Sequence, residues 1–177
     1  AGYETAMKAG IKPDLVVGDF DSAKEPPPKE IKCVSLPVDK DVTDTMFAVM
    51  KGFNLGLHSF LLLGCLGGKR FDHSLANLEV LQYIREHGGH GIMAGDHTKI
   101  FLLQEERLKM TGMAGAIVSV FPYNGSNCIV SYSGLKYPLN RGQLSCGGLP
   151  MGVSNQVTGD PAEVRVHSGC ALVVVGQ

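Results

Sequence analysis

Two aspartates two residues apart, Asp19 and Asp21, directly follow the short apolar run at residues 15–17. In an extended chain, residues i and i+2 project to the same side, so the two carboxylates can face one point. Ligands of open α/β sheets collect at the carboxyl ends of strands. Two carboxylates there suit a hard cation such as Mg²⁺, which usually carries phosphates with it. Aspartate and serine are also common turn residues, so a turn with two solvated aspartates is the alternative for the pair alone.

Two further polar clusters occur where a strand is expected to lead into a helix. The first covers residues 40–44, and the second is formed by Arg70, Asp72 and His73 after the glycine-rich turn at 64–68. In a parallel α/β sheet these junctions would share one edge. Helix N-termini and glycine-rich turns attract phosphate, whereas carboxylates repel it unless a metal ion intervenes. The combination therefore predicts a site for metal-bridged polyphosphate.

Each member of these clusters also has a purely structural interpretation. Thr43 or Asp44 can be a helix cap, and Lys40 can be a solvated surface lysine. Arg70 can simply pair with Asp72, and His73 can stabilise the helix start. The glycine-rich turn lacks the Gly-Lys-Ser/Thr of a P-loop. The joint pattern is therefore stronger evidence for phosphate chemistry than any single residue.

Hydrophobic periodicity changes along the chain and predicts two domains. The first half alternates strands with helices, expected at strands 15–17, 32–36, 59–63 and 91–94 and at helices 44–53 and 74–87. The second half is rich in glycine and β-formers, with strands expected at 98–103, 116–121, 127–132, 164–167 and 171–175 and a turn expected at residues 140–142. These patterns predict an α/β class protein with an N-terminal parallel-sheet α/β domain over residues 1–95 and a C-terminal all-β sandwich domain over residues 96–177.

Composition excludes several classes of partner. The chain has 177 residues, 44% of them hydrophobic and 19% charged, which is typical of a globular protein. With a net charge of −1 and no basic stripe, neither nucleic acid nor an anionic membrane is an expected partner. The cysteine count of five is odd and no Cys-x-x-Cys occurs. We therefore expect no disulfide framework or structural zinc site, and a reducing cytoplasm as the compartment.

With these residues assembled, the chain closely resembles the bacterial type of the thiamine pyrophosphokinase (thiamine diphosphokinase) family. The resemblance runs nearly from end to end and is carried by residues 13–22, 40–44, 67–78, 133–137 and 152–155. It implies a nucleotide-binding α/β domain, a β-sandwich domain that binds thiamine and forms the dimer, and a homodimer with active sites between subunits. It also implies the reaction of ATP with thiamine to give AMP and thiamine diphosphate, with Mg²⁺ as cofactor.

The resemblance assigns roles to individual residues, and these roles fit a reaction that needs mainly positioning and charge neutralisation. The expected Mg²⁺ ligands are the carboxylates of Asp19, Asp21 and Asp44. Asp44 is also the candidate to receive the proton of the thiamine hydroxyl. The expected contacts of nucleotide or phosphate are Lys40, Arg70, Asp72, His73 and Asn77, with Arg70 on phosphate oxygens. Ser154 and Asn155 match the segment expected to hold the thiamine pyrimidine, donated by the partner subunit.

The sequence departs from the family pattern in ways that keep alternatives open. The family normally has an upstream strand and an acidic turn, and we expect both to be missing before Ala1. Lys69 separates Gly68 from Arg70, and Gln156 stands where an acidic residue commonly follows Ser-Asn. One alternative is a diphosphotransferase for another hydroxymethyl heterocycle, such as a pterin, and another is a non-catalytic thiamine or nucleotide sensor.

Overall fold

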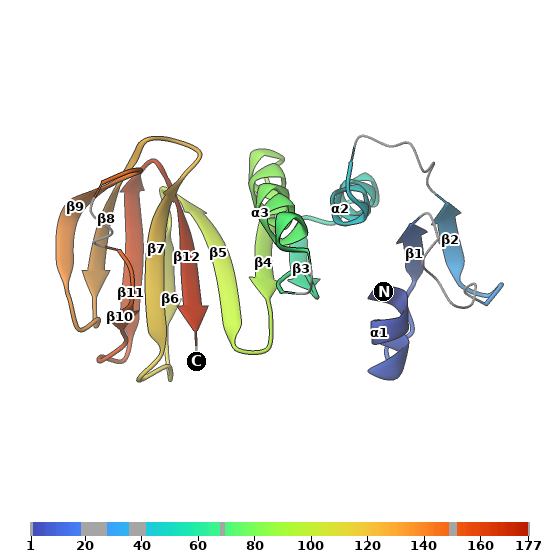
Figure 1. The fold of residues 1–177 in the computed structure, drawn as a ribbon, viewed down its shortest axis with the longest axis horizontal. Coiled ribbons are helices and arrows are strands. Elements are labelled where there is room, and N and C mark those ends of the chain that lie inside the picture. Colours follow the sequence, from blue (N-terminus) through green and yellow to red (C-terminus); the bar gives the residue numbers. More distant parts are fainter. Residues whose placement is uncertain (1, 19–27, 36–41, 68–69, 149–151, 177) are drawn as a thin grey trace.

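The computed structural model describes residues 2–18, 28–35, 42–67, 70–148 and 152–176 (Figure 1). Its helices are α1 (Gly2–Lys8), α2 (Asp44–Asn54) and α3 (Phe71–Glu86). Its strands are β1 (Leu15–Gly18), β2 (Lys32–Ser35), β3 (Ser59–Leu63), β4 (His90–Ala94), β5 (Thr98–Gln104), β6 (Arg107–Met110), β7 (Ile117–Tyr123), β8 (Asn127–Ser133), β9 (Leu139–Ser145), β10 (Asn155–Gln156), β11 (Ala162–Ser168) and β12 (Cys170–Gly176). Among these described helices, none has the length and apolar character needed to cross a membrane.

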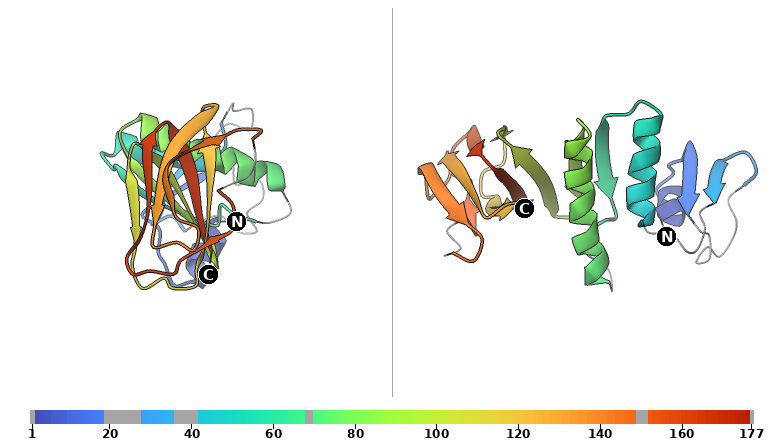
Figure 2. Two further views of the ribbon diagram at one scale, coloured as in Figure 1. Left: turned by 90° about the vertical axis from the view of Figure 1, so that its left-hand side faces the viewer. Right: turned by 90° about the horizontal axis from the view of Figure 1, so that it is seen from above.

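The N-terminal half is an α/β arrangement with parallel strands, as the alternating pattern predicts. β1 pairs with β2 and β3 pairs with β4, both in parallel. Helix α2 contacts both β1 and α3 and lies between them in Figure 1 and in the right-hand view of Figure 2. Among the described strands, the β1–β2 pair forms its own sheet, while β3 and β4 belong to a larger one. The single shared parallel sheet that we expected is therefore not seen in this part of the chain.

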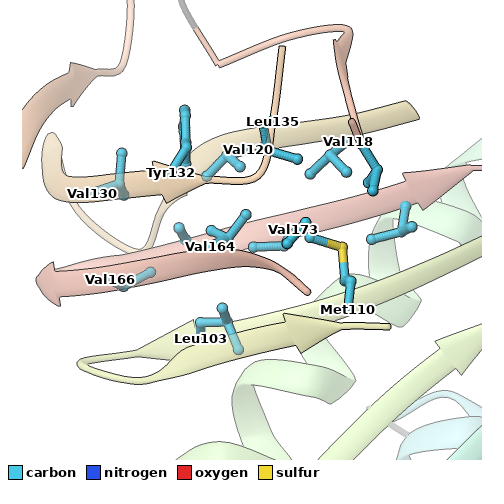
Figure 3. Close-up of a cluster of buried hydrophobic side chains, with 14 of the residues drawn as sticks. Leu103, Met110, Val118, Val120, Val130, Tyr132, Leu135, Val164, Val166 and Val173 are labelled. Carbon is cyan, nitrogen blue, oxygen red and sulfur yellow. The ribbon is translucent and has the colours of Figure 1, made fainter. Parts of the chain in front are cut away.

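The C-terminal half is a β-sandwich, which confirms the predicted class. Among the described strands, one sheet is six-stranded, in the order β10-β7-β12-β5-β4-β3, and includes β3 and β4 of the N-terminal half. The other is four-stranded, in the order β6-β11-β8-β9. Alternate residues of the two sheets enclose an apolar core (Figure 3) that includes Val118, Val130, Val164, Val166 and Val173. This alternation leaves the other face of each strand outside the core.

The six-stranded sheet continues across the expected domain boundary at residue 95. β4 pairs antiparallel with β5, placing Ile92 beside Phe101 and Ala94 beside Lys99. A second apolar cluster lies under α3, where Leu81 and Ile84 pack with Leu62 and Met93. The division into residues 1–95 and 96–177 remains a prediction.

Several elements differ from the expectation. α3 begins at Phe71 rather than at residue 74, and α1, β6 and β10 were not anticipated. The prediction of a turn at residues 140–142 was wrong, because these residues lie within β9. Arg141 has a positive φ of 49°, and the β8–β9 register shifts beside it. The turn-like residues therefore form an irregularity inside a strand rather than its end.

Candidate functional site

The structure describes only part of the predicted site. Asp19, Asp21 and Lys40 lie outside the described residues, and β1 ends at Gly18 immediately before the first of them. The predicted site residues that it does describe are Asp44, Arg70, Asp72, His73, Asn77, Ser154 and Asn155. Within the described ranges, no group of three His, Cys, Asp or Glu side chains is arranged to hold a metal ion. The predicted Mg²⁺ ligand set, which needs Asp19 and Asp21, remains a prediction.

Asp44 is the first residue of α2 and is exposed there. Thr43 is the N-cap, and its Oγ1 accepts a hydrogen bond from the Met46 backbone N–H at 3.2 Å. This confirms the predicted cap and fixes the start of the helix. The Asp44 carboxylate therefore lies at the positive end of the helix dipole.

Asn77 is buried, and it holds the turn between β3 and α3 in place. Asn77 is only 8% exposed, and its Nδ2 donates to the Cys65 carbonyl oxygen at 2.9 Å. This bond ties the first residues after β3 to the second turn of the helix. At the helix start, the backbone N–H of His73 donates to the Arg70 carbonyl oxygen at 3.1 Å. Asn77 therefore fixes the position of Cys65 at the start of the glycine-rich turn. Its contact with nucleotide remains a prediction.

Arg70 and Asp72 form a forked ion pair at the start of α3. Arg70 Nε donates to Asp72 Oδ1 at 2.9 Å, and Nη2 donates to Oδ2. The two side chains are 68% and 61% exposed. The hydrogen bonds from Arg70 lower the pKa of Asp72 to about 2, and the same pair raises the pKa of Arg70. This is the simple pairing foreseen from the sequence, and it holds a guanidinium in the open beside a helix N-terminus.

Asn155 brings together the two C-terminal segments that carry the family resemblance. It is 5% exposed, and its Oδ1 accepts from the backbone N–H groups of Tyr137 (3.0 Å) and Gln156 (2.9 Å). Its Nδ2 donates to the Tyr137 carbonyl oxygen at 2.8 Å. The amide therefore takes the place of a backbone neighbour for Tyr137, directly after the bridge between Leu135 and Val157. The side chain is fully engaged in positioning, while the adjacent Ser154 is exposed with φ 58°.

Tyr137 is a candidate functional residue that the sequence analysis did not single out. Its ring is 61% exposed although both backbone groups are held by Asn155. The Lys136 Nζ lies 5.6 Å from the ring centroid. An exposed aromatic ring on a backbone that is fixed in place is suited to stack on a planar heterocycle. The available signal was its position in the segment 133–137, in a chain that has no tryptophan.

A pocket of about 270 Å³ lies beside the Ser154 segment. Its lining includes Val120, Phe121, Leu144, Cys146 and Val153. The backbone of this segment is fastened to β7, since Val120 N–H donates to the Gly152 carbonyl at 2.7 Å and Ser154 N–H donates to Ser119 Oγ at 3.0 Å. The mainly apolar pocket and the exposed polar Ser154 are therefore neighbours on one fixed segment.

Comparisons with known proteins agree with this arrangement. Two family models match, "Thiamin pyrophosphokinase, catalytic domain" over residues 1–92 and "Thiamin pyrophosphokinase, vitamin B1 binding domain" over residues 101–172. Among solved structures, the thiamine pyrophosphokinase from Bacillus subtilis is similar with a TM-score of 0.86 at 21% identity, covering 99% of this chain and 84% of that one.

Two more solved structures share the fold at similarly low identity. The thiamin pyrophosphokinase from Geobacillus thermodenitrificans has a TM-score of 0.82 at 22% identity and covers 99% of this chain and 83% of its own. The one from Candida albicans has a TM-score of 0.77 at 16% identity, with coverages of 99% and 76%. No curated protein sequence matches the chain.

Proposed function

The chain belongs to the thiamin pyrophosphokinase family, and from this premise we propose how its own residues carry out the reaction. The protein is a kinase of the transferase class that moves the diphosphoryl group of ATP onto the hydroxyl of thiamine. The hydroxyl oxygen attacks the β-phosphorus, the bond between that phosphorus and the oxygen bridging to the α-phosphorus breaks, and AMP leaves. The proton of the hydroxyl passes to a carboxylate, for which Asp44 is our candidate.

Metal binding is assigned to the carboxylates of Asp19, Asp21 and Asp44. Oxygen ligands of this kind match the preference of Mg²⁺, and the bound ion would neutralise phosphate charge. The support is the chemistry of the donor set and the position of Asp44 at the start of α2. Lys40, four residues before Asp44 in the sequence, is assigned to the phosphates of the nucleotide.

The observation that carries the phosphate assignment is the exposed Arg70 guanidinium at the N-terminus of α3. Asp72 accepts hydrogen bonds from its Nε and Nη2, and Asn77 fixes the turn that precedes it. A phosphate oxygen can bind the remaining N–H groups of the fork. In this proposal Arg70 and His73 face the nucleotide, whereas Asp72 and Asn77 position the groups that do.

Thiamine binding is assigned to Ser154 and to the ring of Tyr137, with Asn155 fixing both segments. Two observations support this assignment: the exposure of Tyr137 and the three hydrogen bonds of Asn155. We further propose a homodimer in which each subunit donates this segment to the active site of its partner. A reducing cytoplasm is the proposed compartment, in keeping with the absence of any disulfide among the five cysteines.

Product analysis tests the reaction. With thiamine, ATP and Mg²⁺, we expect thiamine diphosphate and AMP in equal amounts. Formation of ADP with thiamine monophosphate would contradict diphosphoryl transfer, and turnover of a hydroxymethyl pterin but not thiamine would favour the alternative substrate. Asp19→Asn and Asp44→Asn should abolish turnover, while Asp96→Asn, an exposed aspartate outside the proposed site, should retain it.

Mixing inactive variants tests the shared active site. Asp44→Asn and Ser154→Ala subunits are each expected to be poorly active alone. In a mixed dimer, one of the two sites would combine an intact Asp44 with an intact Ser154 from the other subunit. Recovery of activity on mixing supports donation across the interface. A monomer by light scattering, or no recovery in a verified mixed dimer, would refute it.

A further inference from the structure

The outer face of the four-stranded sheet carries basic side chains that the proposed reaction does not use. On β11, Val164 and Val166 point into the core (Figure 3), so the alternating residues Arg165 and His167 lie on the opposite face. Arg165 pairs in register with Arg107 of β6 on one side and with Ser131 of β8 on the other.

The register makes this row of cations compact. Neighbouring strands lie about 4.8 Å apart, so β6, β11, β8 and β9 bring Arg107, Arg165, Ser131 and Arg141 within roughly 15 Å. Like charges directly opposite each other on antiparallel strands are destabilising, and Arg107 and Arg165 are such a pair. Among the described residues, neither they nor Arg141 forms an ion pair with a carboxylate. The nearest acidic position on this face, Glu163, is itself paired in register with Lys109.

Hydrogen bonds join Arg141, Ser131 and His167 into one network. The Arg141 backbone N–H donates to Ser131 Oγ at 2.9 Å, and this oxygen lies 2.7 Å from His167 Nε2. Arg141 Nη1 lies 3.3 Å from His167 Nδ1. Because the guanidinium can only donate, Nδ1 must accept in this contact and Nε2–H then donates to Ser131. The Ser131 hydroxyl proton is left to donate outward.

As far as the described residues go, the network therefore presents several donors and no carboxylate acceptor. Arg141, which belongs to this network, has a left-handed backbone conformation with φ 49°. This conformation is unfavourable for a residue with a side chain. Ser131 stabilises that conformation through the Arg141 N–H. Unpaired cations, an outward hydroxyl and a locally strained arginine are together complementary to an oxyanion.

We propose that Arg107, Ser131, Arg141, Arg165 and His167 form a binding site for a small, soluble polyphosphate-type anion. A small ligand is favoured over nucleic acid because Tyr132, the one aromatic ring of Phe, Tyr or Trp type in β6, β8, β9 and β11, is buried at 4% exposure. Single-stranded nucleic acid sites need exposed rings for stacking. The site lies on the four-stranded sheet, whereas Asp44 and Arg70 lie at the starts of α2 and α3.

His167 provides a local reporter for binding. Partial burial, together with the positive charges of Arg141 and Arg165, lowers the pKa of His167. A bound polyanion neutralises these charges, so it should raise the His167 pKa. The probe is sodium tripolyphosphate, and the readout is the pH titration of the His167 ring by NMR, assigned with His167→Gln. This readout does not depend on events at the proposed catalytic site.

The expected result is a saturable upward shift of the His167 pKa with tripolyphosphate. Arg165→Gln should weaken binding at least about tenfold, because it removes a charge-assisted donor. Lys99→Gln, which removes one exposed cation from β5, should leave binding unchanged. Binding should also weaken with added salt. Arg165→Gln is expected to retain thiamine diphosphate formation, so failure of this proposal and failure of the proposed function are distinguishable.

Several results would overturn the assignment. The site is refuted by the absence of a shift in the wild type at millimolar tripolyphosphate, or by an equal shift in Arg165→Gln. A shift produced by vesicles with anionic headgroups, or by a DNA oligonucleotide, but not by tripolyphosphate would identify a different partner and reject a small anion. Loss of turnover in a folded Arg165→Gln protein would reject a separate site, because it would place this residue in the catalytic machinery.

Discussion

Replacing Asn155 with alanine tests whether this residue positions the thiamine segment. The buried amide makes three hydrogen bonds, two with the backbone of Tyr137 and one with the N–H of Gln156. Each such bond contributes about 1 kcal/mol net, so losing all three should lower the free energy of unfolding by roughly 3 kcal/mol. For a chain of this size, that corresponds to a fall in Tm of about 6–12 °C.

Urea unfolding followed by circular dichroism measures this change, and Asn127→Ala is the matched control. Asn127 is an exposed asparagine of the same sandwich, and in the described part of the chain its Nδ2 donates to Ser126 Oγ alone, at 3.2 Å. We expect its replacement to cost less than about 0.5 kcal/mol. In folded Asn155→Ala, the KM for thiamine should rise more than the KM for ATP, because Tyr137 and Ser154 lose their support. Equal stability of the two variants would refute the reasoning.

Three other expectations follow from local geometry. Gly134→Ala should lower the free energy of unfolding by roughly 3 kcal/mol, because the new Cβ would lie 2.8 Å from the backbone of β11 at a residue with positive φ. Gly112 also has a positive φ but lies in open space, so Gly112→Ala should cost about 1 kcal/mol in the same urea assay. Arg70→Gln should raise the pKa of Asp72 from about 2 toward its usual range, and NMR of the carboxyl group measures this change. The Arg70–Asp72 pair stabilises the fold above the unfolded-state pKa of Asp72, and this stabilisation is lost as the pH falls toward 2. Burial, together with the neighbouring Glu79, raises the pKa of Tyr123. The protonated Tyr123 therefore stabilises the fold below the usual tyrosine pKa, and this stabilisation declines above about pH 10. Tyr123→Phe should make the free energy of unfolding from urea curves less dependent on pH in that range.

Local patterns were sufficient to predict the elements whose signals lie in a few adjacent residues. The 3–4 spacing of apolar residues and Thr43 predicted α2 and its cap, and both are confirmed. The start of α3 at Phe71 was missed, because this side chain is 73% exposed and adds nothing to the apolar periodicity. β9 was missed because Arg141 is held in its left-handed conformation by Ser131, ten residues earlier. Such a contact leaves no signal in the local sequence.

The same limit applies to the roles of the site residues. Asn77 and Asn155 were predicted to touch ligands, yet each is buried and its amide bonds to backbone groups. An asparagine can donate and accept at once, so it can substitute for a peptide group where a strand or helix neighbour is lacking. A buried asparagine can therefore hold an irregular segment in place. Ligands often bind at such segments when rigid elements position them. We therefore expect Tyr137 and Arg70, the exposed groups that these segments hold or lead to, to carry the direct contacts, with the asparagines determining where those groups lie.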